Sequence, residues 1–384
     1  MRAEDFHAPE VGRLVTTIEG ALAFVPAPLP PRIDYDAELV LALSKADGAL
    51  SELSGLGRQL PDPHLLIAPY LRQEAVLSSR IEGTVTTLSE LLIDQAGGAT
   101  SARERDDLRE VRNYVTALEH GLARLADLPL SLRLVREVHE QLMRGVRGNS
   151  RAPGEFRRVQ NWIGPPDCTL ASATYVPPPV AEMTEALGLW ERFLNDRGGM
   201  PALVQCALMH EHFEAIHPFL DGNGRVGRLM ITLMLVERGR LSQPLLYLSA
   251  FIEAHRNEYY DSLLRVCTEG DWRGWLLFFL AGVTETAERA ARQAAELMDI
   301  RERFHQRLRR APRAVALVDE LFRSPYVTTA SAARALGVST PTAKRAIDKL
   351  LDAGVLETVG ERAWRRVYVA PEILRAIESP LENL

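Results

Sequence analysis

The chain has 384 residues, 46% hydrophobic and 25% charged, as expected of a globular protein with one large and one smaller domain. Its three cysteines, Cys168, Cys206 and Cys267, show no metal-type spacing and predict no disulfide framework, so we expect a cytoplasmic protein. The N-terminus lacks the layout of a signal peptide, and the longest apolar run, Trp275–Val283, is far shorter than the ~20 residues that span a bilayer. We therefore expect no membrane partner.

The net charge of −6 is unevenly distributed along the chain. Residues 301–384 carry fifteen basic and ten acidic side chains, a net of +5, so the rest of the chain carries −11. An acidic body joined to a mildly basic end suggests different partners for the two parts, although a solvated charged surface explains the pattern equally well.

The N-terminal region predicts an arm followed by helices. Residues 1–34 include a proline-rich stretch, Pro26–Arg32, that predicts an extended arm. After a first helical pattern, another helix is predicted from Pro69, which suits a first turn, to Glu82. Gly83 is a natural helix terminator. Glu82, however, places a negative charge at the negative end of the helix dipole, which costs up to about 1 kcal/mol unless a cation lies nearby.

The middle of the chain alternates helices with one segment of different texture. Apolar spacing predicts helices over residues 106–125, 132–143 and 180–195. Between the last two, β-prone runs flank a Gly-Pro turn within residues 154–176, which predicts a hairpin. An ordered proline-rich loop is the alternative for this segment.

A glycine-rich turn between two helices is the most informative stretch. Pro201–Ile216 has helical spacing, and Pro218 should end that helix near His217, because a proline disfavours the helical conformation in the residue before it. Val226–Val236 is apolar almost all round, as in a buried helix. The turn Gly222–Gly224 therefore opens this second helix.

The side chains around this turn suit a polyphosphate. A helix N-terminus offers unpaired N–H groups and partial positive charge, and glycines let an anion come close. Arg225 and Arg228 lie three residues apart and share a helix face, where their guanidinium groups can bind phosphate oxygens. Asp221 offers the oxygen that Mg²⁺ prefers, and His217 could accept a proton from an attacking hydroxyl.

Other interpretations of this region are a dinucleotide site, a simple helix-capping turn and a zinc site. Gly222–Gly227 matches the dinucleotide pattern GxGxxG, but that pattern requires a preceding strand, and here a helix precedes it. His210 and His212, with Glu211 and Glu214, suggest zinc ligands, but their spacing is not His-Glu-x-x-His. Packed core histidines are the simpler interpretation.

The chain beyond residue 311 predicts a separate unit. Helical patterns at Thr329–Leu336 and Thr340–Ala353 are joined by a short glycine turn, and two β-prone runs follow, which resembles a winged helix-turn-helix. Such a unit binds DNA or serves as a dimerisation or docking module. The groups that could meet phosphates and base edges are Thr340, Thr342, Lys344 and Arg345 on the second helix, and Arg362, Arg365 and Arg366 on the wing.

The stretch from His217 to Arg228 resembles the signature HPFx(D/E)GNGRxxR of the Fic family at every specified position. The resemblance extends over residues 35–295 and implies transfer of AMP from ATP to a Ser, Thr or Tyr hydroxyl of a target protein. It implies that His217 is the catalytic base and Asp221 the Mg²⁺ ligand. The implied ATP-binding residues are Gly222, Asn223, Gly224, Arg225, Gly227 and Arg228. Of these, Arg228 would bind the γ-phosphate. Tyr259 and Tyr260 would lie near the adenine base.

A second motif resembles the inhibitory helix of the same family. Ser78-x-x-x-Glu82-Gly83 fits its pattern, which implies that Glu82 pairs with Arg228 and holds it away from the γ-phosphate. The family's hairpin flap would align a target segment by strand addition, and the implied flap residues are Trp162, Ile163 and Gly164. For the tyrosine pair, aromatic core packing is an equal alternative.

These patterns together predict a mainly α protein: a Fic-type helical domain with a short β-hairpin flap, plus a C-terminal winged helix-turn-helix. The predicted divisions are 1–110 for the arm and inhibitory region, 111–300 for the catalytic core and 311–384 for the C-terminal domain. The predicted activity is AMP transfer to a target protein and to the protein itself. Alternatives are a nucleotide-sensing, DNA-binding regulator without transferase activity, or removal of AMP by the same site. A DNA or protein partner for the C-terminal domain and a homodimer are further expectations.

Overall fold

The computed structural model describes residues 1–59, 64–95, 102–146, 152–165, 167–359 and 366–378. The predicted wing residues Arg362 and Arg365 lie outside these ranges. The helices of the first half are α1 (Ala37–Gln59), α2 (His64–Ile81), α3 (Leu88–Gln95), α4 (Ala102–Arg124), α5 (Leu132–Leu142) and α6 (Val180–Asn195). Those of the body's second half are α7 (Ala202–Ile216), α8 (Asn223–Glu237), α9 (Ser249–Ala254), α10 (Arg256–Glu269) and α11 (Trp272–Leu308). The predicted mainly α fold is confirmed.

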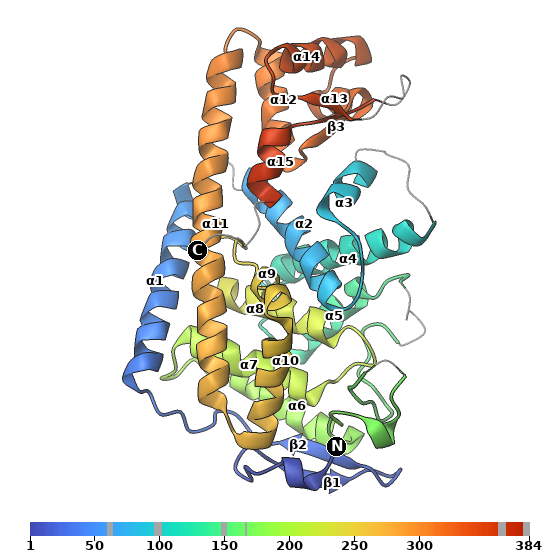
Figure 1. Ribbon diagram of the computed structural model, residues 1–384, viewed down its shortest axis with the longest axis vertical. Coiled ribbons are helices and arrows are strands. Elements are labelled where there is room, and N and C mark those ends of the chain that lie inside the picture. The colour runs from blue at the N-terminus through green and yellow to red at the C-terminus, as the bar shows by residue number, and fades with distance from the viewer. Residues whose placement is uncertain (60–63, 96–101, 147–151, 166, 360–365, 379–384) are drawn as a thin grey trace.

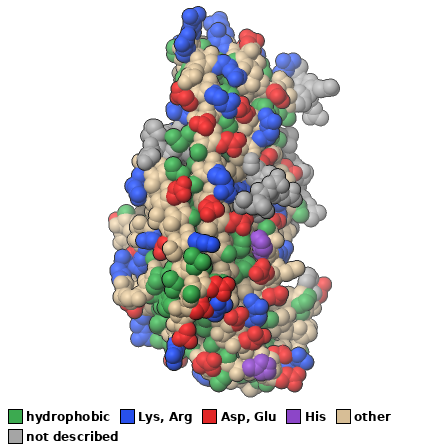
Figure 2. All heavy atoms as spheres, turned by 60° about the vertical axis from the view of Figure 1, so that its left-hand side comes forward, with side chains coloured by type: hydrophobic (Ala, Val, Ile, Leu, Met, Phe, Trp, Pro, Cys, Tyr) green, Lys and Arg blue, Asp and Glu red, His purple; other side chains and the backbone are tan. Residues whose placement is uncertain are grey.

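The longest helix, α11, organises the molecule. It has 37 residues, which corresponds to about 55 Å. It runs alongside α1, with a small N-terminal sheet near one end and the C-terminal unit near the other (Figure 1). Figure 2 shows basic and acidic side chains interspersed on the face that it draws. None of the helices in the described ranges is long and apolar enough to cross a membrane.

The helix pair predicted around the glycine turn lies in the core. Nearly every side chain of α7 and α8 is buried, and these include polar residues such as His210 and Glu211 of α7 and Arg228 of α8. Two buried indoles tie α7 to its neighbours. Trp190 of α6 donates to the Met209 carbonyl at 3.0 Å, and Trp275 of α11 donates to the Ala207 carbonyl at 2.9 Å. These contacts fix α7 against α6 and α11, and α7 in turn positions the turn that leads to α8.

The N-terminal region holds one feature that the sequence did not predict, and one expectation for it was wrong. The segment before the proline-rich stretch forms a two-stranded antiparallel sheet, β1 (Gly12–Thr16) and β2 (Leu22–Pro26). Burial of Phe24 and its neighbours holds β2 against the body. Helix α2 begins at His64, so Pro69 lies inside it rather than in its first turn. Burial of the flanking apolar residues outweighs the hydrogen bond that proline cannot donate.

The C-terminal unit consists of α12 (Pro312–Arg323), β3 (Tyr326–Thr328), α13 (Thr329–Leu336), α14 (Thr340–Asp352), β4 (Glu357–Val359), β5 (Val367–Val369) and α15 (Pro371–Glu378). Its antiparallel sheet has the order β3-β5-β4. The unit packs on the body, since α12 contacts α2 and α15 contacts α11. This element order is the one expected of a winged helix-turn-helix, and that assignment stays a prediction, as do the divisions at 110 and 300.

Candidate active site

The loop between α7 and α8 adopts the sharp path that its sequence predicts. His217 caps α7 in the left-handed conformation, with φ of 48°, and Gly222 precedes α8 with φ of 80°. The Asn223 side chain closes the loop, because it accepts from the Phe219 N–H at 2.8 Å and donates to the Phe219 carbonyl at 2.9 Å. Asn223 therefore offers an anion its backbone N–H, while its side chain holds the loop in shape.

The structure fixes which nitrogen of the His217 ring carries a proton. Its Nδ1 lies 3.3 Å from the Glu214 carbonyl. A carbonyl can only accept, so Nδ1 carries the proton and Nε2 keeps its lone pair. Burial lowers the pKa of His217 to about 4, which keeps the imidazole neutral at physiological pH.

Arg228 is held by the two predicted inhibitory residues. Its Nε donates to Ser78 Oγ at 2.8 Å, and its Nη2 donates to the Ser78 carbonyl at 3.0 Å and to Glu82 Oε1 at 2.7 Å. Burial opposes charge on both partners, but Arg228 still lowers the pKa of Glu82, and Glu82 raises that of Arg228. The Arg228 side chain is only 2% exposed, against 33% for Glu82.

The Glu82 carboxylate also occupies the N-terminal end of α8. A Cβ atom at Gly224 would collide with Glu82 Oε1. The Glu82 carboxylate thus interacts favourably with the positive end of the α8 dipole. This interaction offsets the unfavourable position of Glu82 just beyond the C-terminus of α2. The site predicted for a phosphate is filled by a carboxylate of the same chain.

Arg225 and Asp221 form a second charged cluster beside the first. Arg225 lies 3.2 Å from Glu110 Oε2 of α4 and 3.4 Å from Asp221 Oδ1. The Asp221 side chain remains 33% exposed. Its carboxylate fits Mg²⁺, which takes one or two carboxylates together with substrate phosphates and water. Within the described ranges, no group of three or more His, Cys, Asp or Glu residues could hold a metal by itself.

The predicted hairpin is reduced to one antiparallel bridge, between Ile163 and Tyr175. Trp162 and Ile163 are both exposed, at 42% and 37%, and the preceding Asn161 donates to the His217 carbonyl at 3.1 Å. Gly164 packs so closely on Cys168 that a Cβ would meet the thiol sulfur at 2.7 Å. Within the described residues the segment is therefore a loop with one bridge, close to the proline-rich alternative.

The predicted tyrosine pair divides into two roles. Tyr259 is 1% exposed, and its hydroxyl lies 2.8 Å from His210 Nε2, so it belongs to the core. Tyr260 is 43% exposed, with the Arg256 guanidinium over its ring at 5.8 Å. Aromatic core packing thus describes Tyr259, and Tyr260 alone stays available to a ligand.

Comparisons with known proteins agree with this geometry. Residues 40–123 match the Fic/DOC family N-terminal region, and residues 129–235 match the Fic/DOC family itself. The chain belongs to the Fic/DOC family. Its fold resembles that of a Fic family protein from Desulfovibrio desulfuricans, with a TM-score of 0.58, 21% identity and coverage of 89% of this chain and 98% of that one. A Fic domain containing signaling protein from Bacteroides thetaiotaomicron has a TM-score of 0.51 at 18% identity, covering 67% and 95%.

Curated relatives match about half of this chain. Protein adenylyltransferase Fic of Drosophila ananassae is 28% identical over 209 residues, which is 53% of this chain and 38% of the relative. The Aedes aegypti protein of the same name is 28% identical over 211 residues, again 53% and 38%. The chain spans well under half of the length of these relatives.

His139 is a residue of the Fic site that the sequence did not single out. Its Nδ1 accepts from the Gly154 N–H at 2.8 Å, so its Nε2–H donates to the Asp221 carbonyl at 3.0 Å. Its ring stacks on Phe219, with centroids 3.7 Å apart and planes 10° apart. The only sequence signal is its place on the apolar face of a predicted helix. His139 thus joins the segment that begins at Gly154 to the loop that carries Asp221.

We expect the two hydrogen bonds of His139 to be separable by substitution. His139→Gln keeps a donor that reaches the Asp221 carbonyl, whereas His139→Asn keeps only an acceptor for Gly154. Loss of one hydrogen bond is worth about 1 kcal/mol, so His139→Asn should weaken Mn²⁺ binding in the presence of ATP about fivefold. Electron paramagnetic resonance measures this affinity directly. His305→Asn, on α11, is the control, and equal affinities in the Asn and Gln variants of His139 would contradict the assignment.

Six buried or partly buried ionisable groups predict an unusual pH dependence of stability. Burial lowers the pKa of four histidines and raises that of two glutamates: about 4 for His139, 3 for His210, 4 for His212, 4 for His217 and 8 for both Glu211 and Glu214. Below about pH 6.5 the histidines bind protons in the unfolded state but not in the folded state, so the free energy of unfolding decreases as pH falls. Between about pH 4.5 and 8 the two glutamates are protonated in the folded state but ionised in the unfolded state. The free energy of unfolding therefore decreases as pH rises through this range.

The free energy of unfolding should therefore peak near about pH 6.5, because four histidines outweigh two glutamates below that pH and only the glutamates act above it. Urea unfolding at several pH values measures the curve. Glu211→Gln should flatten the decline on the alkaline side, since glutamine mimics the protonated acid. Stability that keeps rising to pH 8 would contradict these protonation states.

Proposed function

We propose that this Fic protein transfers AMP from ATP to a Ser, Thr or Tyr hydroxyl of a target protein, and also to itself. The proposal rests on one observation. A neutral His217, with its Nε2 unprotonated, lies in the loop before the N-terminus of α8, whose first turns carry Arg225 and Arg228. The names of the curated relatives support the same activity.

The reaction follows from these positions. The target oxygen bonds to the α-phosphorus of ATP, and its proton passes to Nε2 of His217. The bond from that phosphorus to the oxygen bridging it to the β-phosphate breaks, and pyrophosphate leaves with the electron pair. The backbone N–H groups at the start of α8, with Arg225, stabilise the developing negative charge. Asp221 would hold Mg²⁺, which supplies positive charge to the phosphates.

In this proposal the described conformation is inhibited. Arg228 is engaged by Ser78 and Glu82, and the Glu82 carboxylate lies where the γ-phosphate would approach Gly224. Catalysis by positioning and electrostatics fails when one arginine is withheld, even though His217 is intact. Release of Glu82 is thus the step that activates the enzyme.

The remaining expectations concern partners and location. Arg345 and Thr340 are exposed on α14, which favours a DNA or protein partner for the C-terminal unit. The three cysteines are free thiols, which favours the reducing cytoplasm. Trp162 and Ile163 would present the flap to a target segment.

ATP carrying its label on either the α- or the γ-phosphate tests the proposal. We expect the purified Glu82→Gly variant to acquire the α-label but not the γ-label. Incorporation of the γ-label would indicate phosphoryl transfer instead. No incorporation in either the wild type or Glu82→Gly would favour the nucleotide-sensing regulator, and loss of AMP from a pre-modified target would favour the reverse reaction.

A further inference from the structure

The C-terminal unit lies next to α2 and α3, the two helices that flank Glu82 (Figure 1). Before Glu82, Arg72 Nη1 of α2 donates to the carbonyl of Arg323, the last residue of α12, at 2.7 Å. After Glu82, Ser89 Oγ of α3 donates to Glu378 Oε1, at the end of α15, at 3.0 Å. Glu82 thus lies between two points at which the C-terminal unit holds the chain.

Ser89 joins α3 to two elements of the C-terminal unit. Its hydroxyl donates to Glu378 of α15 and accepts from Tyr326 Oη of β3 at 3.3 Å. Helix α3 has eight residues, and a helix of that length is not stable on its own in water. It therefore depends on tertiary contacts, among them the burial of Leu91 and Leu92 and the two hydrogen bonds of Ser89.

The link from Glu82 to α3 makes few contacts of its own. Of residues 83–87, all within the described part of the chain, Thr86 alone is buried, and Val85 is 68% exposed. The space around Gly83 is open, so that a Cβ there would meet nothing within 4 Å. The position of this link, and of Glu82 at its start, therefore depends on the two helices that it joins.

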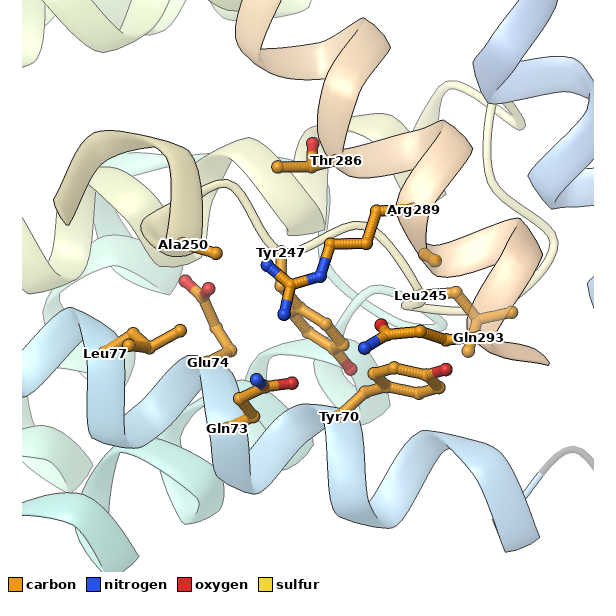
Figure 3. Close-up of a pocket in the computed structure, with 11 residues that line it drawn as sticks. Tyr70, Gln73, Glu74, Leu77, Leu245, Tyr247, Ala250, Thr286, Arg289 and Gln293 are labelled. Carbon is orange, nitrogen blue, oxygen red and sulfur yellow. The ribbon is translucent and has the colours of Figure 1, made fainter. Parts of the chain in front are cut away.

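The middle of α2 is fixed by the body of the protein. Figure 3 shows Glu74 among the side chains that α2 directs toward α9 and α11. The buried Glu74 carboxylate accepts from Tyr114 Oη of α4 at 3.0 Å and from Ser249 Oγ of α9 at 2.5 Å. Because these bonds hold α2 in place, we expect Glu82 to leave Arg228 through motion of the link and α3 rather than of the whole of α2.

The C-terminal unit is itself anchored on α11. Gln293 Nε2 of α11 donates to the Ala376 carbonyl of α15 at 3.2 Å. Asp319 of α12 lies 2.8 Å from Arg301 Nε and 2.9 Å from His305 Nε2, both on α11. Since α11 also packs against α7, the unit holds α3 in a fixed position relative to the helix that ends at the ATP loop.

We propose that the C-terminal unit is a regulatory domain, which holds α3 through Ser89 and so keeps Glu82 paired with Arg228. Displacement of the unit from α3 then activates the enzyme. The effect on transfer rests on the proposed function, whereas the hold on α3 does not. A partner that binds the displaced unit more tightly than the docked unit would favour release of Glu82 by the ratio of its two affinities.

Hydrogen–deuterium exchange of residues 78–95 and AMP self-labelling, both in the full chain, test the proposal. Ser89→Ala removes both hydrogen bonds of the hydroxyl. Alanine is the better helix former, so faster exchange in α3 would come from the lost contacts and not from helix propensity. We expect exchange and initial labelling rate each to rise about threefold, because these hydrogen bonds are largely exposed and therefore weak.

Three further variants serve as controls. Ser89→Thr keeps the hydroxyl and should behave as the wild type does. Glu378→Ala removes the acceptor on α15 and should reproduce the effect of Ser89→Ala. Glu357→Ala changes an exposed glutamate of the same unit, on β4, and should alter neither exchange nor labelling.

A double substitution decides whether Ser89 acts through Glu82. In the Glu82→Gly background Ser89→Ala should add nothing to the labelling rate, because the contact that it loosens is already absent. An equal gain in both backgrounds would overturn the proposal, as would unchanged exchange in both Ser89→Ala and Glu378→Ala. Faster exchange without faster labelling, in a protein that Glu82→Gly activates, would overturn the coupling. If Glu82→Gly labels nothing, the proposed function fails, and exchange still decides whether the unit holds α3.

Discussion

Replacing Glu82 by glycine is expected to raise the rate of AMP self-labelling about tenfold. A hydrogen bond to a charged group contributes about 1.5–3 kcal/mol, and the 33% exposure of the Glu82 side chain places this one at the lower end. A change of about 1.4 kcal/mol corresponds to a factor of ten in the population of released Arg228. Quantified transfer of α-labelled AMP under initial-rate conditions measures the gain.

The stability of the same variant gives an independent check. Arg228, 2% exposed, loses the carboxylate that pairs with it and keeps two hydrogen bonds to Ser78, so the ligand-free protein should unfold at a lower temperature. ATP with Mg²⁺ should restore more stability to Glu82→Gly than to the wild type, because the γ-phosphate takes the vacated place. Glu19→Gly, in an exposed turn, controls for the added flexibility. Labelling that is unchanged in Glu82→Gly would remove Glu82 from the inhibitory role.

What the sequence could predict in this protein was local. The ends of α6 and α7 follow from apolar spacing and flanking prolines, and the α7–α8 turn follows from glycine and proline positions. The Glu82–Arg228 contact joins residues 146 positions apart, and it could be predicted only because both ends resemble motifs of one family. The start of α2 was misplaced because burial overrode the local signal of Pro69.

Residues that act through distant partners were not predictable in this way. Glu110 meets Arg225 across 115 positions, and Arg157 donates to the His217 carbonyl across 60. Neither lies in a motif, and a buried charge gives no periodic signal. The Tyr259–Tyr260 pair shows the same limit, since only packing reveals which ring faces the core. Motifs identify the groups that meet a ligand, while the groups that orient them depend on tertiary contacts.

Substitution of His217 by alanine is expected to have the largest effect on catalysis. A positioned general base contributes about 10²–10⁴-fold, so transfer measured in the Glu82→Gly background should fall by that factor. Binding of ATP should change little, because the imidazole contacts the Glu214 carbonyl and no arginine of the cluster. Isothermal titration with a non-hydrolysable ATP analogue measures affinity, and α-label incorporation measures rate.

The pH dependence of the Glu82→Gly variant separates a base from a structural histidine. Because burial lowers the pKa of His217 to about 4, the imidazole is already neutral at pH 6, and its loss of function by protonation should occur only as pH falls toward that value. Transfer should therefore not decline between pH 8 and 6 through this group. His120→Ala, which removes a surface imidazole that contacts Glu137, should leave both rate and profile unchanged. If His217→Ala retained transfer within a few fold of its parent, the hydroxyl would have to lose its proton to another group, and no reaction through His217 could be maintained.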